Sequence, residues 1–295
     1  MNRRGKIICM FGRCMSVFLL APSLVFLNAV AAPLQPTFPK TVAPGVLQLG
    51  LIQDPEIKEC SGLIASRKYP EVFWTHNDGK REKLFAITRQ GKTLAEFHVK
   101  GMEVNDWEDI AIDRENNLYV SDTGNNYCKR TEAAVYRLRE PDPNSGKKSV
   151  HVEQHWRLKY PGAPFDCESL VVDGTNGFVV SKVTHHRMAE LYRFSLDPAK
   201  EVQTLQVVGR LMIDSPATAA DLSPDGKSLA VLAKSGPFIF KIDGDISKAV
   251  RVSPSHKLFP HESMEACTFV REGLLVAAES REIFLFTDEM FRSGK

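Results

Sequence analysis

Short apolar segments separated by turns recur along the chain from about residue 45 to residue 287. Residues 105–113 show the unit: acids flank a short apolar segment, and a second apolar segment follows at 118–120 after a turn. Apolar runs of four to eight residues between turn-forming residues are typical of buried strands. The pattern therefore predicts an all-β domain over residues 45–288.

The unit occurs five times. The inner strands of the copies begin at Ser61, Glu108, Glu168, Thr218 and Glu265, so that successive copies start 47, 60, 50 and 47 residues apart. A period of about 40–50 residues with four strands per copy is typical of a β-propeller. We predict a five-bladed β-propeller.

Each copy is expected to continue outward from its inner strand. Second strands are predicted at 72–74, 118–120, 178–180, 229–231 and 274–276, and third strands at 83–87, 135–138, 191–195, 238–242 and 283–287. Fourth strands are predicted at 93–99, 151–158, 203–211 and 249–252. The fifth copy has no fourth strand, whereas residues 46–52 form a strand without a neighbouring partner. This N-terminal strand is expected to close the last blade and so to protect an open sheet edge.

The N-terminal residues differ in composition from the rest. Residues 1–13 are basic, an apolar run follows to Leu27, and Ala29-Val30-Ala31 is a small-x-small cleavage site, as in secretory signal peptides. We predict a signal peptide over 1–31, cleaved near Ala31, and export to the periplasm or the extracellular space. An uncleaved anchor is the alternative, but the run is shorter than the ~20 residues of a membrane span. A Pro-rich leader (32–44) and a C-terminal tail (289–295) flank the domain.

The net charge argues against one class of partner, and the cysteine content allows a disulfide. The formal charge is +2, and removing the four basic residues of the signal peptide leaves about −2 (2 − 4) on the remainder, which argues against nucleic-acid binding because that requires a basic surface. We expect a monomer without a membrane span after cleavage. Four cysteines remain (Cys60, Cys128, Cys167 and Cys267). Cys128 and Cys167 are the candidate disulfide pair, and for Cys267 a free buried thiol in a strand is the alternative interpretation.

The first residues of the five inner strands are candidate metal ligands. Ser61, Glu108, Glu168, Thr218 and Glu265 all carry oxygen, and inner strands line the central channel of a propeller. Three carboxylates converging there repel one another, and Ca2+ accepts about six to eight oxygen ligands. We therefore predict an axial Ca2+; strand-start residues solvated by water are the alternative. Asp109 is interpreted as a local strand-start residue.

The order Ser, Glu, Glu, Thr, Glu resembles the calcium ring of the five-bladed calcium-dependent nucleotidases (soluble apyrases), which use Ser, Glu, Glu, Ser, Glu. That family also has an Asp-Asp-Arg-Thr-Gly loop after the second strand of its first blade, where this chain has His76-Asn77-Asp78-Gly79. The resemblance implies a Ca2+-dependent nucleotidase activity. The turn at 223–227, Ser-Pro-Asp-Gly-Lys, resembles instead that of many secreted bacterial repeat propellers that only bind.

Polar residues at the ends of the second strands are expected on the same face as the ring. Asp78 and Asp122 are the candidate catalytic residues, because either could position a water. The candidate substrate-binding residues are His76, Asn77, Asn125, Lys182, His185, Lys234, Glu279 and Arg281. Cations beside a metal suit an anionic substrate. The predicted function is hydrolysis of a small phosphate-containing molecule; the alternative is a non-catalytic binding or scaffold propeller with a structural ion.

Overall fold

The computed structural model describes residues 37–183, 187–261 and 263–292. The predicted signal peptide, the first residues of the Pro-rich leader and the candidate His185 lie outside the described residues. In the part of the chain that is described, no helix is long and apolar enough to span a membrane.

The described residues form antiparallel sheets of short strands. The first sheet path begins with β3 (Cys60–Ala65), β4 (Phe73–Asn77), β5 (Lys83–Ile87) and β6 (Thr93–Lys100), and continues through β10 (Ser149–Lys159), β9 (Glu132–Arg139), β8 (Asn117–Asp122) and β7 (Asp109–Ile112). Its two halves meet where β6 and β10 pair in parallel over three residues each. Strand β14 (Val202–Thr204) pairs in parallel with the other end of β10.

Three further sheets complete the domain. One contains β11 (Val171–Asp173), β12 (Asn176–Val180), β13 (Glu190–Ser195) and β15 (Gln206–Arg210). The next contains β16 (Ala217–Leu222), β17 (Ser228–Ala233), β18 (Gly236–Lys241) and β19 (Ser255–His256). The last contains β20 (Met264–Val270), β21 (Gly273–Ala278), β22 (Glu282–Thr287), β2 (Val46–Leu51) and β1 (Lys40–Ala43).

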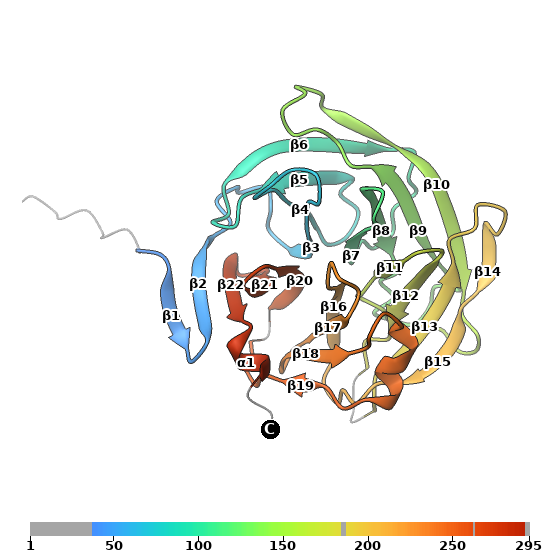
Figure 1. Ribbon diagram of the computed structural model, residues 1–295. Coiled ribbons are helices and arrows are strands. Elements are labelled where there is room, and N and C mark those ends of the chain that lie inside the picture. Colours follow the sequence, from blue (N-terminus) through green and yellow to red (C-terminus); the bar gives the residue numbers. More distant parts are fainter. Residues whose placement is uncertain (1–36, 184–186, 262, 293–295) are drawn as a thin grey trace, which may run out of the picture. The chain divides into compact units, whose positions relative to one another are not determined.

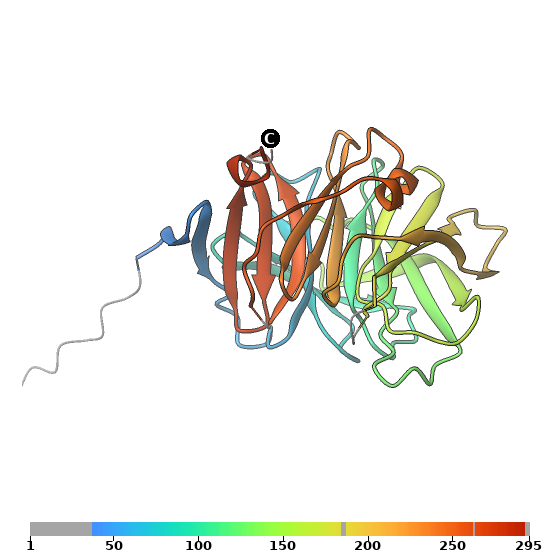
Figure 2. The same cartoon turned by 90° about the horizontal axis from the view of Figure 1, so that it is seen from below.

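The sheets are arranged radially around one axis, which is the architecture of a β-propeller (Figure 1). The inner strands contact one another in the cyclic order β3, β7, β11, β16, β20 and back to β3. Seen from the side, the strands of neighbouring sheets stand next to one another around the axis (Figure 2). The predicted all-β propeller is confirmed.

The N-terminal strand behaves as the sequence predicts. Strand β2 pairs antiparallel with β22, with Val46 opposite Phe286, so that the first and last parts of the domain share one sheet. The end of the predicted leader adds β1 to the outer edge of β2. The predicted C-terminal tail begins with α1 (Glu289–Arg292).

One predicted outer strand is wrong. Residues 249–252 lie largely in a 3₁₀ helix (Ile246–Arg251), and β19 takes the outer position beside β18 instead. Asp245 caps this helix, since its side chain accepts a hydrogen bond from the Ser247 backbone nitrogen. Asp is a strong N-cap residue because its carboxylate satisfies an unpaired backbone donor. Ile246 and Ala249 are both buried, and they face the core from this helix and not from a strand.

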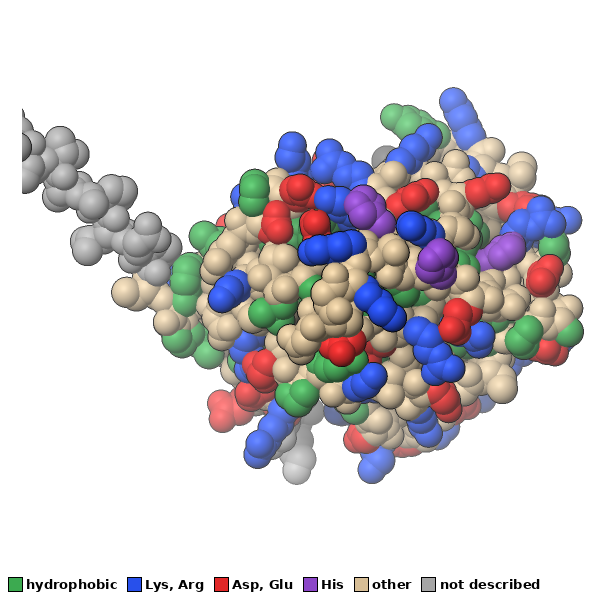
Figure 3. Space-filling model, turned by 90° about the horizontal axis from the view of Figure 1, so that it is seen from above, with side chains coloured by type: hydrophobic (Ala, Val, Ile, Leu, Met, Phe, Trp, Pro, Cys, Tyr) green, Lys and Arg blue, Asp and Glu red, His purple; other side chains and the backbone are tan. Residues whose placement is uncertain are grey.

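The core of the described residues consists of five apolar clusters. Four lie between neighbouring sheets, and one lies between the two halves of the long sheet. Trp74, Trp107 and Trp156 are each 0% exposed, as expected for core residues. Because apolar clusters cover both faces of most inner strands, the sequences of these strands are nearly continuous apolar runs. On the face shown in Figure 3, Lys and Arg side chains are interspersed with acids.

Candidate metal centre

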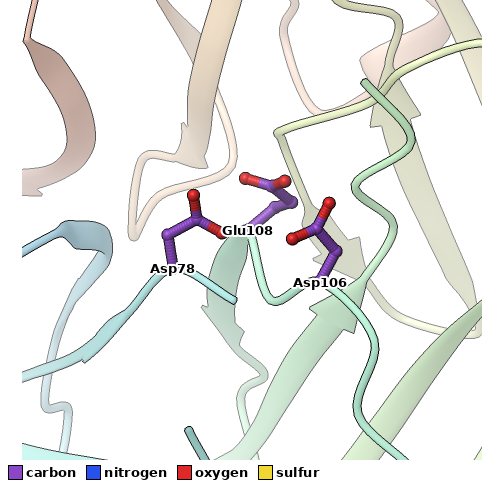
Figure 4. Close-up of side chains that lie close together, drawn as sticks. All are labelled: Asp78, Asp106 and Glu108. Atoms are coloured by element: carbon purple, nitrogen blue, oxygen red, sulfur yellow. The ribbon is translucent and has the colours of Figure 1, made fainter. Parts of the chain in front are cut away.

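Carboxylates from the inner ends of neighbouring sheets gather beside the axis. The side chains of Asp78, Asp106 and Glu108 point toward one another (Figure 4). A second group contains Glu108, Asp166 and Glu168. In each group, one carboxylate oxygen from every member lies within 4.8 Å of the others. Because Glu108 belongs to both groups, five acids form one continuous cluster, which we call the axial acids.

The local structure brings these acids together through a repeated Asp-x-Glu sequence. Asp106-Trp107-Glu108 leads into β7, and Asp166-Cys167-Glu168 leads toward β11. Isolated bridges between Trp107 and Gly79, and between Cys167 and Ser181, keep both segments extended. Residues two apart in an extended chain point to the same side. Each segment therefore presents two carboxylates toward one place.

Glu108 lies at the centre of the cluster. Its side chain is 3% exposed, and its Oε1 atom is buried without a hydrogen-bond partner in the described structure. Ser61 donates its hydroxyl hydrogen bond to the backbone carbonyl oxygen of Glu108 (2.8 Å). Burial, and then the neighbouring Glu168 carboxylate, raises the pKa of Glu108 well above its ordinary value. The other oxygen, Oε2, lies 3.5 Å from the Ser61 hydroxyl. A buried carboxylate oxygen without a partner is costly unless a proton or a cation neutralises the group.

Two other acids of the predicted ring already have a positive partner. Lys182 forms an ion pair with Glu168, and Lys234 forms one with Glu265. By contrast, no ion pair involves Asp78, Asp106, Glu108 or Asp166 within the described ranges. The negative charge that lacks a Lys or Arg partner is thus concentrated on one side of the axis.

The predicted ring therefore divides into unlike members. The Thr218 hydroxyl donates to the backbone carbonyl oxygen of Met264 (2.9 Å) and links two inner strands. Ser61 makes the equivalent bond to Glu108. Glu108 and Glu168 lie among the axial acids, whereas Glu265 belongs to neither group of converging acids.

Asp122, a predicted catalytic residue, is surrounded by protein donors. Its carboxylate accepts hydrogen bonds from the backbone nitrogens of Asn105 (3.1 Å) and Asp106 (2.6 Å) and pairs with Arg130 (2.8 Å). It is 1% exposed. Asp122 thus holds the turn that carries Asp106 rather than pointing into the cluster.

Three predicted substrate-binding residues are also buried structural groups. Asn77 accepts hydrogen bonds from the backbone nitrogens at positions 58 and 59 and donates to the carbonyl oxygen of Glu56. Asn125 closes its own loop by accepting from the backbone nitrogens of Lys129 and Arg130. His76 is 0% exposed and packs edge-on against Trp107, with ring centroids 5.2 Å apart. Burial lowers the pKa of His76 to about 4, so the imidazole is neutral.

The remaining predicted ligands lie at the end of the β21 strand. Arg281 adopts a φ of 82° and donates through its guanidinium to the carbonyl oxygen of Asp54 (2.7 Å), which joins β22 to the chain that follows β2. The backbone nitrogen of Glu279 donates to the carbonyl oxygen of Ser263 (2.8 Å).

Asp106 and Asp166 are the cluster members that the sequence reasoning missed. Both precede a ring glutamate by two residues, in the first position of the Asp-x-Glu sequence. That spacing could have identified them, because an extended strand start places both carboxylates on one side.

The predicted Cys128–Cys167 disulfide is wrong. Cys60, Cys128, Cys167 and Cys267 are all free thiols. Cys128 is exposed at a φ of 51°, whereas Cys167 is buried with its sulfur directed at the carbonyl oxygen of Ser169 (3.7 Å). Cys60, Cys167 and Cys267 are buried free thiols, as the alternative interpretation predicts for Cys267.

We expect that, in the presence of a chelator, the melting temperature rises as the pH is lowered from about 7.5 to about 5.5. Burial, and then the charge of Asp106, raises the pKa of Asp78 from 3.8 to about 6, and burial raises that of Asp221 to about 6. The folded state therefore holds protons that the unfolded state releases, and stability is lost as the pH rises through about 6. Thermal melts in EDTA across this range test the sign; a melting temperature that increases with pH contradicts it.

Comparison with known proteins gives only distant likenesses. No family model and no curated protein matches the chain. Similar solved structures include XC5397 from Xanthomonas campestris, a gluconolactonase (TM-score 0.49, 12% identity, covering 82% of this chain and 89% of that chain). Another is the PQQ-bound aldose sugar dehydrogenase of Streptomyces coelicolor (TM-score 0.47, 10% identity, covering 81% and 96%). The resemblance to the calcium-dependent nucleotidases receives no support from these comparisons.

Proposed function

We propose that the domain is a five-bladed propeller whose axial acids bind a divalent cation, and that it hydrolyses a small anionic ester with that cation. The blade count is supported by the five inner strands that follow one another around the axis. The long sheet then counts as two blades, because its halves join only through the short β6–β10 contact at their outer edges.

The observation that carries the proposed cation site is the buried, unpartnered Oε1 atom of Glu108 between two groups of carboxylates. The donors are all carboxylate oxygens, which suit Ca2+ better than zinc. We assign Asp78, Asp106 and Glu108 as the main ligands, since none of them has an ion-pair partner in the described structure. Asp166 and Glu168 face them from the next blade. If the chain is exported, a Kd of about 10⁻⁴–10⁻³ M is sufficient, as in extracellular modules.

A bound divalent cation supplies Lewis-acid polarisation of a substrate oxygen and a more acidic bound water. The side chains of this chain have distinct tasks around it. Asp78, whose Oδ1 atom is buried without a partner, is placed to orient a water. Asp122 and Arg130 act as positioning residues, because they hold the turn that carries Asp106.

A non-catalytic scaffold with a structural ion is the second candidate function. It is favoured by the ion pairs of Lys182 and Lys234 and by the use of Asn77, Asn125 and Asp122 to fasten loops. Such groups hold inner strands in place whether or not a substrate is present.

The test compares wild type with Gly124→Ala. A Cβ atom at Gly124 would lie 2.1 Å from Glu108 Oε1 and 2.5 Å from Asp106 Oδ2, so that the methyl group occupies the space between the carboxylates without changing their charge. The panel contains 4-nitrophenyl phosphate, which is an anionic ester, with the neutral ester 4-nitrophenyl acetate and the anhydride ADP for comparison. We expect wild type to hydrolyse the anionic ester in a Ca2+-dependent manner. The variant is expected to lose both Ca2+-induced thermal stabilisation and activity, and EGTA should reproduce the loss in wild type.

The same experiment distinguishes the two candidate functions. Turnover that survives EGTA argues against the cation-dependent hydrolase. Stabilisation by Ca2+ without turnover of any substrate in the panel supports the scaffold. A Gly124→Ala protein that is still stabilised by Ca2+ as strongly as wild type overturns the assigned cation site. Gly162→Ala is the matched control, because nothing lies within 4 Å of the added Cβ there and Gly162 does not adopt a positive φ.

A further inference from the structure

A hollow of about 310 Å³ opens beside the axial acids. It lies between the 163–166 segment and strand β13. Asp166 and Lys182 line its inner end, and Arg187 and Glu190 line its outer end. This volume is within the range of small-ligand pockets, about 300–1,000 Å³. Residues 184–186 are outside the described part of the chain, and none of them is among the residues that line the hollow.

The wall of the hollow is aromatic and held rigidly. Phe165 stacks on Tyr192 with ring centroids 4.5 Å apart and an interplanar angle of 21°, and Tyr160 contacts Phe165 edge-on at 4.8 Å. The Tyr192 hydroxyl donates to Glu190 Oε2 (2.6 Å), which fixes the ring in place. Phe165, Tyr192 and Val183 line the hollow and offer an apolar surface suited to a flat ring of a ligand, and Tyr160 supports Phe165 from behind.

A second hollow of about 330 Å³ borders the first. The two share Val183, Arg187 and Glu190, and the second adds Met188 and Arg210. Arg210 pairs with Glu190 (3.3 Å). Two guanidinium groups therefore face one carboxylate, and one positive charge is left in excess at the outer end. Arg side chains recognise carboxylate and phosphate groups through paired hydrogen bonds.

We propose that these two hollows form one groove that binds the substrate of the axial site, and that the substrate is an aryl ester with a second anionic group. Its ester oxygens would lie beside the cation that the axial acids are proposed to hold, its ring lies against Phe165 and Val183, and its distal carboxylate or phosphate is bound by Arg187 and Arg210. The substrate class rests on the proposed function; the groove and its distal anion site do not require hydrolysis.

Binding of two matched probes tests the groove. Phenyl phosphate has no distal anion, whereas 4-phosphonooxybenzoate carries a carboxylate opposite its phosphate. Titration calorimetry is carried out with the full chain in Ca2+ and in EGTA. We expect wild type to bind 4-phosphonooxybenzoate about tenfold more tightly than phenyl phosphate, the effect of a charge-assisted hydrogen bond. The Arg187→Gln/Arg210→Gln variant should lose this preference and keep its affinity for phenyl phosphate.

Arg193→Gln is the control, because Arg193 is exposed on β13, bonds to Gln206 (2.9 Å) and lines neither hollow. It should keep the preference. The proposal is overturned if wild type shows no preference, binds neither probe at millimolar concentration, or keeps its preference in the double variant. A preference that disappears in the double variant, without turnover in Ca2+, supports the groove while the hydrolase fails.

Discussion

Replacing Glu108 with glutamine is expected to weaken Ca2+ binding strongly and, at the same time, to stabilise the cation-free protein. Glu108 is shared by both groups of axial acids, and its Oε1 atom is buried without a partner. Loss of a shared ligand should weaken Ca2+ binding by at least ~100-fold, the upper end of the cost of losing even an outer-shell partner. The neutral amide also removes the repulsion from Glu168 and Asp78 that helps to raise the pKa of Glu108.

The two effects have opposite signs and are measured separately. Titration with Ca2+ or Tb3+ gives the affinity, and thermal melts in EDTA give the stability of the cation-free protein. Glu265→Gln is the matched control: it removes an inner-strand glutamate of the same kind, but one whose carboxylate is paired with Lys234. We expect little change in cation affinity in that control. A Glu108→Gln protein that binds Tb3+ like wild type excludes Glu108 as a ligand.

Most of the strand order could be predicted from the sequence because apolar runs and turn residues repeat with one period. The predicted third strand of the first copy, 83–87, coincides with β5 (Lys83–Ile87). The pairing of β2 with β22 follows from counting strands, since one copy lacks an outer strand and one strand lacks a partner. The failure at 249–252 shows the limit of apolar patterns: two buried residues three apart fit a helical turn as well as a strand, and the Asp245 cap favours the turn.

The site was harder to predict because equivalent positions in a repeat need not have equivalent partners. Glu108, Glu168 and Glu265 occupy the same place in their copies, but Lys182 and Lys234 neutralise only the last two. Lys182 pairs within its own copy, whereas Lys234 pairs with the glutamate of the next copy, and periodicity does not encode this difference. Asp122 illustrates the same point, because only the structure shows that its oxygens are used by Arg130 and by the backbone at 105–106.

The sequence predicts that Asp109 is a local strand-start residue, and the structure gives it a wider role. One carboxylate oxygen accepts hydrogen bonds from the backbone nitrogens of Leu170 (2.8 Å) and Ala220 (3.2 Å), which belong to the chain next to β11 and to β16. The other oxygen accepts from the backbone nitrogen of Ile110 (2.9 Å). Asp109 is 0% exposed. A single buried side chain thus connects three neighbouring inner strands.

We therefore expect Asp109→Ala to destabilise the fold more than any other substitution considered above. A buried donor left without its acceptor costs about 1–3 kcal/mol, and three such donors together cost roughly 3–6 kcal/mol because water reaches some of them after relaxation. A domain has only about 5–15 kcal/mol of net stability, so the variant lies close to global unfolding. Urea unfolding followed by the fluorescence of the buried tryptophans gives the free energy of unfolding.

The control for this prediction is Asp113→Ala, at the residue that follows strand β7. Asp113 is also buried and accepts four hydrogen bonds, from the backbone nitrogens of Glu115 and Asn117, the Asn117 amide and the Tyr119 hydroxyl. All of its partners lie within one hairpin next to solvent, which can rearrange or hydrate locally. If linkage between neighbouring inner strands is what matters, Asp109→Ala must cost clearly more than Asp113→Ala, although it removes fewer hydrogen bonds. Equal urea midpoints for the two variants would mean that each aspartate stabilises only its own hairpin.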